Sequence, residues 1–574
     1  MPKPTVPSLS RFPVYRSKKF LASVQERLGS LKHISPLRRN ALAFLAILGL
    51  LATRRWQQLV LPQLWVEDGT QLLSAYIDQG WAALFVPVNG YLVVVPKIIS
   101  AISVELSFSN LPIISTIIAW LFIAFVGMAI ALSPTKLKWR MCCAISVFFI
   151  PSAPEVFGVP LYTFWWSALL LFLVVLWDEK AAHIGWRIVF LLLGGLSSPV
   201  IVAVLPVLYL RSCYLYKSLK SERVITFIAT LIAAIQLYFV LSGSSITITD
   251  STSPLPLLTA IKLIVPKFMG TFMVGNWNSS PSFLWVEGTA LLALIVAWLA
   301  SNYRTAWAWI LVYLLLISIA MAATRIDLRE INQCTSGPRY FFFPYILTFW
   351  ILIQYFYGAS KTVFIRTLIG VAIASAITNS IPVWSQDHAD LRWKDHVHSA
   401  GLFDEYDIPI QYDRSRTLTW HLQVSGENCA ALLARDMLYR VQPTYPYRVR
   451  AVADHVRGEP GAIALISNTM TLPDYHKSQI PGHRVIGSLS GADTGALSLK
   501  LRRGDEIFYR SRPITARQSV TIVGLEHEFL SDLPQANRWV RLSFSNSKLP
   551  PEFVVIIEDG GRAAGEGSAI AIPE

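Results

Sequence analysis

Long apolar blocks recur along the chain from residue 41 to about residue 384 and then stop. Each block predicts a membrane-spanning helix, because a helix satisfies its backbone hydrogen bonds internally. Several blocks are shorter than the roughly 20 residues that a perpendicular helix needs, and short helices are tolerated against protein or a water-filled cavity. The pattern predicts about eleven spans, near 41–59, 111–132, 140–153, 161–177, 187–198, 199–210, 224–242, 284–300, 307–323, 339–357 and 367–384.

The pattern changes after about residue 430. Short runs with apolar residues at alternate positions replace the long blocks, for example at 496–501 and 539–544, and Gly, Pro, Asn and Asp separate them. This period of two residues is typical of strands with one buried face. The predicted fold class is therefore a mainly α polytopic membrane protein with a C-terminal extracytoplasmic antiparallel β-sandwich.

These patterns divide the chain into four regions. We expect a basic cytoplasmic segment at 1–39, a multi-span membrane domain at 40–384, an outer-surface linker at 385–430 and the β-sandwich at 431–574. The membrane domain contains a first outer loop at 54–110, which follows the first apolar block.

Composition and charge agree with this organisation. Hydrophobic residues make up 53% of the 574 residues and charged residues 15%, against about 25% charged in soluble proteins. The net charge is +14, and residues 1–39 carry nine Lys or Arg side chains against one acid. Basic short connections stay cytoplasmic, so the N-terminus is expected inside. The sequence has no nucleic-acid-binding motif, so nucleic acid is not expected as a partner.

The orientation depends on residues 91–106. The basic loops all fall on the inner side only if this segment does not cross the membrane fully. It contains Pro96, Lys97 and Glu105, which favour a surface or re-entrant helix.

An acidic pair follows the first apolar block, in the run Trp65-Val66-Glu67-Asp68-Gly69. Carboxylates at a membrane surface are costly, so they usually serve an ion, a substrate or a partner. One carboxylate can take a proton from an acceptor hydroxyl, and its neighbour can orient it or hold a divalent cation. An interfacial loop with an aromatic belt and solvated acids explains the run equally well. The same loop offers further candidates for substrate contacts: Asn89, Tyr91 and Lys97.

Arg339 and Tyr340 lie in a second run, from Gly337 to Tyr345, at the outer mouth of a late span. The planar guanidinium group suits a phosphate, because it donates several hydrogen bonds in a fixed geometry. Taken alone, the run is better explained as an interfacial anchor, since Arg and Tyr commonly mark that boundary.

Together the two runs resemble the GT-C superfamily of integral-membrane glycosyltransferases, in particular its less characterised bacterial members. A short first span, Trp-x-Glu-Asp-Gly, Gly-Tyr-x-x-x-Pro-Lys, many short helices and a late Arg-Tyr-Phe-Phe-x-Pro carry the resemblance, over roughly residues 36–420. Such enzymes use polyprenyl-phosphate sugars on the outer face. The resemblance implies that Asp68 is the catalytic base and that Glu67 assists it or binds a cation. Arg339 and Tyr340 would meet the lipid phosphate. Independently of the resemblance, the ring of Trp65 offers a face against which a sugar can stack.

The second outer loop departs from the family pattern. Relatives often carry a polar Gly-Asn-x-x-Asn-like stretch before a Trp, whereas the run from Glu155 to Trp165 lacks those amides. Glu155 is still expected as a substrate contact facing the cavity, but the run does not identify the sugar.

The resemblance implies an enzyme of the bacterial inner membrane that moves a sugar from a polyprenyl-phosphate donor to a surface glycan, lipid or protein. Membrane lipids are the other expected partner. The sequence identifies no cofactor, and a divalent cation, Mg²⁺ or Mn²⁺, at Glu67 and Asp68 stays open. Two alternatives remain: a transporter or flippase of lipid-linked sugars, and a noncatalytic glycan-binding scaffold. A disulfide between Cys334 and Cys429, both expected outside, also stays open.

Overall fold

The computed structural model describes most of the membrane part and scattered segments of the tail. The described residues are 35–152, 154–181, 184–242, 257–275, 280–333, 336–358, 363–385, 388, 391, 393–394, 397, 405–413, 418–438, 464–465, 483–487, 495–504, 506–512, 518–522, 540–543, 551–559 and 567–573. Most of the basic segment expected at 1–39 lies outside them, as does Cys334. Cys429 is a buried free thiol that donates to the carbonyl of Val397 (3.2 Å), so the structure does not pair it with Cys334.

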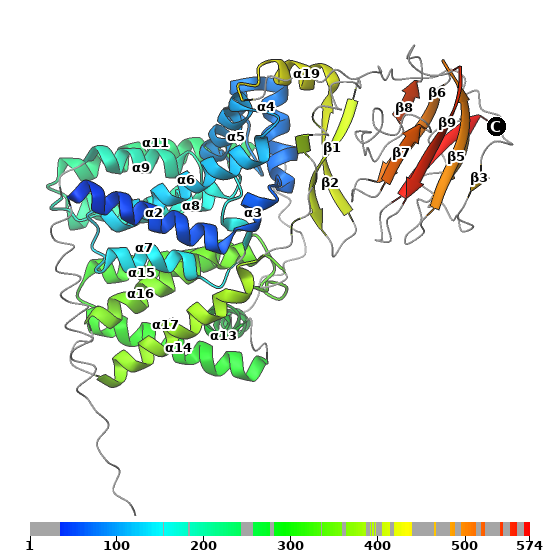
Figure 1. The fold of residues 1–574 in the computed structure, drawn as a ribbon. Helices are drawn as coiled ribbons and strands as arrows, with labels where there is room; N and C mark the ends of the chain where they lie inside the picture. The colour runs from blue at the N-terminus through cyan, green and yellow to red at the C-terminus, as the bar shows by residue number, and fades with distance from the viewer. Residues whose placement is uncertain are drawn as a thin grey trace, which may run out of the picture.

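Seven helices among the described residues are long and apolar enough to cross a membrane. Figure 1 shows most of them stacked side by side with similar axis directions. They are compatible with a multi-pass membrane protein, as the apolar blocks predict. The seven are α2 (Pro36–Arg54), α6 (Leu111–Leu132), α11 (Lys220–Ser242), α14 (Pro281–Asn302), α15 (Ala306–Ala323), η8 with α16 (Pro338–Phe341 and Phe342–Gly358) and α17 with η9 (Val363–Ser380 and Ile381–Val383).

Four further apolar segments form shorter helices, so the prediction of about eleven spans is only partly confirmed. The α8 helix has 13 residues, of which all but one are buried. Its length of about 20 Å is less than the roughly 30 Å of a bilayer core. It is tolerated because protein surrounds it on every side. The four are α7 with η4 (Arg140–Ser146 and Val147–Phe149), α8 (Thr163–Val175), α9 (Ile184–Gly195) and α10 with η6 (Val200–Leu210 and Arg211–Leu215).

A buried ion cluster closes the C-terminal end of α8. Arg187 and Arg211 both bind Glu222, with N–O distances of 2.8 Å, and all three side chains are at most 4% exposed. Their remaining donors reach backbone carbonyls at the end of α8: Arg187 binds Val174, and Arg211 binds Val175. Cations suit the negative end of a helix dipole. The cluster therefore joins α9, η6 and α11 to the end of α8.

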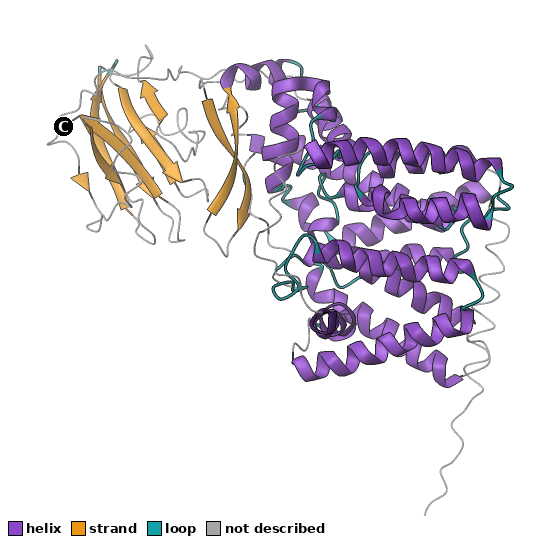
Figure 2. Ribbon diagram, turned by 180° about the vertical axis from the view of Figure 1, so that it is seen from behind, coloured by secondary structure: helices purple, strands orange, loops and turns teal. Residues whose placement is uncertain are grey.

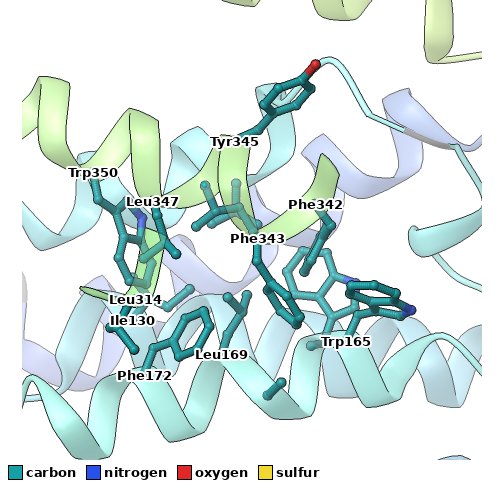
Figure 3. Packing of buried hydrophobic residues seen from close by; sticks show 14 of the residues in the cluster. Ile130, Trp165, Leu169, Phe172, Leu314, Phe342, Phe343, Tyr345, Leu347 and Trp350 are labelled. Atoms are coloured by element: carbon teal, nitrogen blue, oxygen red, sulfur yellow. The ribbon is translucent and has the colours of Figure 1, made fainter. Parts of the chain in front are cut away.

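The core between α8 and α16 consists of aromatic side chains. Phe343 packs against Trp165 and Phe172, with ring centroids 4.9 and 5.3 Å apart, as Figure 3 shows. Phe342 contacts Trp166 at 5.4 Å. Each such pair contributes about 0.5–1.5 kcal/mol beyond area burial. Since Arg339 directly precedes this part of α16, the packing fixes Arg339 beside the start of α8.

The region at 54–110, expected as the first outer loop, folds into short helices. They are α3 (Gln57–Val60), η2 (Asp68–Leu73), α4 (Ser74–Gln79), η3 (Gly80–Phe85) and α5 (Val94–Leu106). With 13 residues, α5 is not among the helices long enough to cross the membrane. A second broken segment, α12 (Leu257–Ile264), η7 (Val265–Gly270) and α13 (Thr271–Val274), packs on α14. Glycines allow the contact, because a Cβ on Gly270 would lie 2.1 Å from the carbonyl oxygen of Leu284.

The expected linker at 385–430 contains an antiparallel hairpin, β1 (Glu405–Asp413) and β2 (Leu418–Ser425), followed by α19 (Gly426–Ala434). Figure 2 shows the hairpin against the helical part. After α19, the buried Asp436 accepts hydrogen bonds from the Ser107 hydroxyl (2.9 Å) and the Ser109 backbone (2.8 Å). The chain is therefore fixed to the α5–α6 junction as far as Asp436.

The described strands beyond 460 form two four-stranded sheets, in the orders β4-β10-β6-β8 and β3-β5-β9-β7, and every pair is antiparallel. Alternate residues of β5 and β9 pair as expected, for example Leu497 with Ile557. Much of the chain that joins the strands lies outside the described residues, so the β-sandwich stays a prediction. The strands are β3 (Ala464–Leu465), β4 (His483–Gly487), β5 (Gly495–Arg502), β6 (Glu506–Arg512), β7 (Gln518–Ile522), β8 (Val540–Ser543), β9 (Glu552–Asp559) and β10 (Gly567–Pro573).

Candidate functional site

Asp68 starts η2 and is held by two backbone donors. Its Oδ1 accepts from the N–H of Leu161 (2.7 Å), and its Oδ2 accepts from the N–H of Trp65 (3.2 Å). The residue is 3% exposed. Burial raises the pKa of Asp68 to about 8, although the two amides oppose the rise. Both oxygens are engaged and screened from solvent, so Asp68 is placed to join two loops rather than to meet a substrate hydroxyl.

Glu67 lies in a different environment, although it is the adjacent residue. Its side chain is partly exposed, but its Oε2 is buried and makes no hydrogen bond among the described residues. Its charge is close enough to act on Arg339, Glu155 and Tyr91. Of the two acids, Glu67 is therefore the one whose side chain is partly exposed and has an oxygen without a hydrogen bond.

Arg339 stands at the centre of the candidate site. Its Nη1 donates to the hydroxyl of Tyr162 (2.9 Å) and lies 3.5 Å from Oε1 of Glu155. The Arg339 side chain is 34% exposed and that of Glu155 is 9% exposed. Burial raises the pKa of Glu155, and the charge of Arg339 opposes that rise. The guanidinium group therefore keeps part of its surface open for an anion while one carboxylate holds it in place.

Local chain geometry brings these groups together. Glu155 lies on η5 (Pro154–Val156), and Arg339 lies on η8. The Ser152 hydroxyl donates to the carbonyl of Pro338 (2.9 Å), which joins the two segments. Gly337 precedes η8 with φ +67°, and a Cβ there would lie 2.8 Å from the Tyr340 ring. Glycine is thus required where the chain turns toward Arg339.

Aromatic rings surround the charged groups. Trp65 meets Tyr162 edge to face at 6.1 Å, and Tyr340 meets Trp165 at 6.0 Å. The Arg339 guanidinium lies 5.6 Å from the Tyr162 ring and 5.7 Å from the Tyr340 ring. Tyr91 contacts the exposed Arg325 at 5.7 Å, and burial raises the pKa of Tyr91 to about 12. The structure therefore brings Trp65, Tyr91 and Tyr340 to the same site as Arg339.

Two of the candidates from the sequence lie elsewhere. Asn89 is exposed, with φ +51°, in the tight turn that pairs Val88 with Tyr91. Lys97 is 3% exposed, and its ammonium group donates to the carbonyls of Ala83 and Val86. Burial lowers the pKa of Lys97 to about 8. Asn89 shapes the turn before Tyr91 and Lys97 holds η3, so neither is placed for substrate contact.

Sequence reasoning missed Tyr162, Arg54 and Arg55. Arg54 is fully buried and donates to the carbonyls of Phe148 (2.6 Å), Ile150 (3.0 Å) and Ser152 (3.1 Å). Arg55 is also fully buried, and its charge acts on Glu155. The pair therefore fixes the loop that carries Glu155. The missed signal was two adjacent arginines at the end of a span on the face expected to lack positive charge.

The β1–β2 hairpin covers η2. The Val66 backbone N–H donates to Oε1 of Gln411 (2.9 Å), and a Cβ on Gly69 would lie 2.5 Å from Cδ1 of Ile410. Ile410 is 1% exposed. The hairpin and the absence of a side chain at Gly69 therefore set the position of the acidic pair.

A metal centre has no support among the described residues. They contain no group of three or more His, Cys, Asp or Glu side chains able to hold an ion. Both oxygens of Asp68 accept backbone hydrogen bonds, so its carboxylate is held in the fold rather than grouped with other acids around one point.

The site thus combines one guanidinium group, two carboxylates with different environments and a surround of aromatic rings. Such a set can hold an anion and accept a proton beside it. No protein-family model matches the chain, and no curated protein matches it.

Proposed function

We propose that this protein is an integral-membrane glycosyltransferase of the GT-C type, which moves a sugar from a polyprenyl-phosphate donor to a glycan, lipid or protein acceptor. The observation that carries the proposal is the position of Arg339. Its side chain is partly exposed and is held by Glu155 and Tyr162, and the charge of the partly exposed Glu67 acts on it. A phosphate leaving group needs a fixed cation, and an attacking hydroxyl needs a nearby base.

In the proposed reaction, the acceptor hydroxyl attacks the anomeric carbon of the sugar. The new bond joins that carbon to the acceptor oxygen, and the bond to the phosphate oxygen breaks with its electron pair. The acceptor proton passes to Glu67, and prenyl phosphate leaves with its negative charge beside Arg339. Trp65 and Tyr340 offer ring faces to the sugar.

The proposal reverses the roles that the family resemblance implies for Glu67 and Asp68. Asp68 is nearly inaccessible and binds Trp65 and Leu161. It acts as a positioning residue that keeps Glu67 in place, and Glu67 is the base. Arg339 supplies the positive charge beside the leaving phosphate.

The proposed orientation follows from the charge pattern. The basic loops lie on the cytoplasmic side of a bacterial inner membrane, and the site opens on the opposite face. The four short helices complete an eleven-span arrangement, and the strands beyond residue 460 form an extracytoplasmic β-sandwich.

The test is transfer by the purified full-length protein. Radiolabelled prenyl-phosphate sugars are supplied as a panel, with membrane extracts as the acceptor source, and product is separated from donor. Wild type should consume one donor class, and Glu67→Gln should not. The exposed Glu330 provides a matched control, because Glu330→Gln removes an acid from a nearby outer loop without touching the site.

The same assay distinguishes the rival functions. A transporter or flippase would move labelled lipid across vesicles without consuming it. A noncatalytic scaffold would bind glycan and give no product. Either result with folded wild-type protein would refute the enzyme.

A further inference from the structure

A groove of about 410 Å³ opens on the side of the helix bundle between α7, α16 and α17. Its lining is aromatic or aliphatic apart from Cys142 and Ser146, and the Ser146 hydroxyl already donates to the carbonyl of Cys143 (2.9 Å). The groove is separate from the candidate site, since it shares no residue with the cluster around Arg339. The residues that line the groove include Trp139, Cys142, Phe356 and Gly370.

The groove exists because α7 is short. Together α7 and η4 cover Arg140–Phe149, about 15 Å of helix against a bilayer core of roughly 30 Å. The neighbouring helices α16 and α17 are longer and leave apolar flanks uncovered. Water gains no hydrogen bonds in such a space. In a bilayer, its natural occupant is a hydrocarbon chain.

One end of the groove is basic. Lys138, Trp139 and Arg140 are consecutive there, and the Trp139 ring meets Phe356 at 5.8 Å. The Arg366 guanidinium lies 5.8 Å from the same Phe356 ring. The Nε of Arg366 is buried and makes no hydrogen bond among the described residues, so the fold leaves this cation without a neutralising partner at that atom. This end lies on the face opposite the candidate site, because α7 leads from it toward the loop that carries Glu155.

We propose that the groove binds an anionic phospholipid from the leaflet opposite the candidate site. One acyl chain lies in the groove, and the phosphate lies among Arg366, Lys138 and Arg140. Charge complementarity favours an anionic headgroup over a zwitterionic one, and basic pockets between spans are suited to such lipids. Trp139 marks the depth of the headgroup, since tryptophan is enriched at the membrane interface. This binding site does not depend on the proposed glycosyltransferase activity.

The experiment compares two lipids with identical acyl chains, phosphatidylglycerol and phosphatidylcholine, on delipidated full-length protein in detergent. Native mass spectrometry counts the bound lipids and gives their affinities. Cys142 supplies a second readout, because this exposed thiol lines the groove. Bound lipid should slow its reaction with a maleimide. The labelling uses a Cys213→Ser background, since Cys213 is also exposed.

Phosphatidylglycerol should bind more tightly than phosphatidylcholine, and Arg366→Gln should weaken it about fivefold, the effect of one basic residue near an anionic lipid. Gly370→Leu should lower the occupancy by either lipid, because a Cβ at Gly370 has only Phe356 within 4.0 Å and further atoms would fill the groove. Arg304→Gln is the control: Arg304 is exposed on the same face and does not line the groove.

Equal affinity for the two lipids would overturn the proposal, as would wild-type binding by both Arg366→Gln and Gly370→Leu. Displacement of all bound phosphatidylglycerol by farnesyl phosphate at equal concentration would also overturn it, because the groove would then belong to a prenyl lipid. Melting temperatures close to wild type would show that each variant is folded. If Arg366→Gln does not fold, Gly370→Leu with the Cys142 readout decides alone.

Discussion

The carboxylate of Asp68 accepts a hydrogen bond from the backbone N–H of Leu161, which lies 93 positions further along the chain, at 2.7 Å. This bond joins the loop of the acidic pair to the start of α8. Because Tyr162 follows Leu161 and holds Arg339, the same bond links the acids to the arginine. The arrangement separates two adjacent acids into one that holds the site and one that faces it.

Glu67→Gln tests the base. Removing the proton acceptor should lower transfer about 10²–10⁴-fold, with the melting temperature unchanged, since Oε2 of Glu67 has no hydrogen bond to lose among the described residues. Initial rates and thermal unfolding of the same preparations give both quantities. Full activity in Glu67→Gln would return the catalytic role to Asp68.

Asp68→Asn should act on stability. An amide can accept from only one of the two backbone donors, and its NH₂ group would then face the other. The free energy of unfolding should fall by about 1–3 kcal/mol. Denaturant titration in detergent measures it. An inactive variant with wild-type stability would show that Asp68 acts in the chemistry itself.

The raised pKa of Asp68 predicts how the stability of the protein varies with pH. Burial raises the pKa of Asp68 to about 8 from an ordinary value of 3.8. Between these values the folded protein binds more protons than the unfolded chain, so stability falls as pH rises. Wild type should lose stability between about pH 4 and about pH 8, and Asp68→Asn should show a shallower slope. Parallel slopes would rule out this residue as the cause.

Variants of Arg339 and Glu155 can separate the contribution of this ion pair to stability from its contribution to sugar transfer. Arg339→Gln should lower transfer about 10²–10³-fold. It should also destabilise the protein by about 1–3 kcal/mol, because Glu155 loses its partner while nearly buried. Glu155→Gln combined with Arg339→Gln should recover stability but not transfer. Recovery of transfer in the double variant would mean that Arg339 serves only to neutralise Glu155.

Gly69→Ala tests the contact between η2 and the hairpin. A Cβ would lie 2.5 Å from Cδ1 of Ile410, and the crowding should cost about 1–3 kcal/mol. Ile410→Val removes that Cδ1 atom. The double variant should therefore be more stable than the sum of the single effects predicts, by about 0.5–1 kcal/mol. Additive effects would place the hairpin away from η2 in the folded protein.

Hydrophobic pattern predicted the long helices because a run of about 20 apolar residues has few alternatives to a membrane span. It missed the hairpin at 405–425, where Pro409 interrupts the alternation. It also missed the helices at 257–274, where Pro266 and Lys267 break the apolar run. Both elements are stabilised by contacts with distant segments, which a local pattern does not contain.

The candidate site was predictable in its charged members and less so in their roles. Glu67, Glu155 and Arg339 stand out because charge is rare and costly in such a chain. The difference between Glu67 and Asp68 arises from backbone donors at Trp65 and Leu161. No property of the sequence reports which of two adjacent acids those donors will reach.

The cluster that closes α8 has a consequence for how the protein is made. Arg187 and Arg211 precede Glu222 in the chain, so the ribosome delivers two cations before the carboxylate that neutralises both. Until Glu222 emerges, the two arginines have no acid to pair with. Burying either cation unpaired in the protein interior would cost several kcal/mol. The helices from α8 to α11 must therefore pack together as one unit in the bilayer. A chain truncated before Glu222 should leave these helices unassembled.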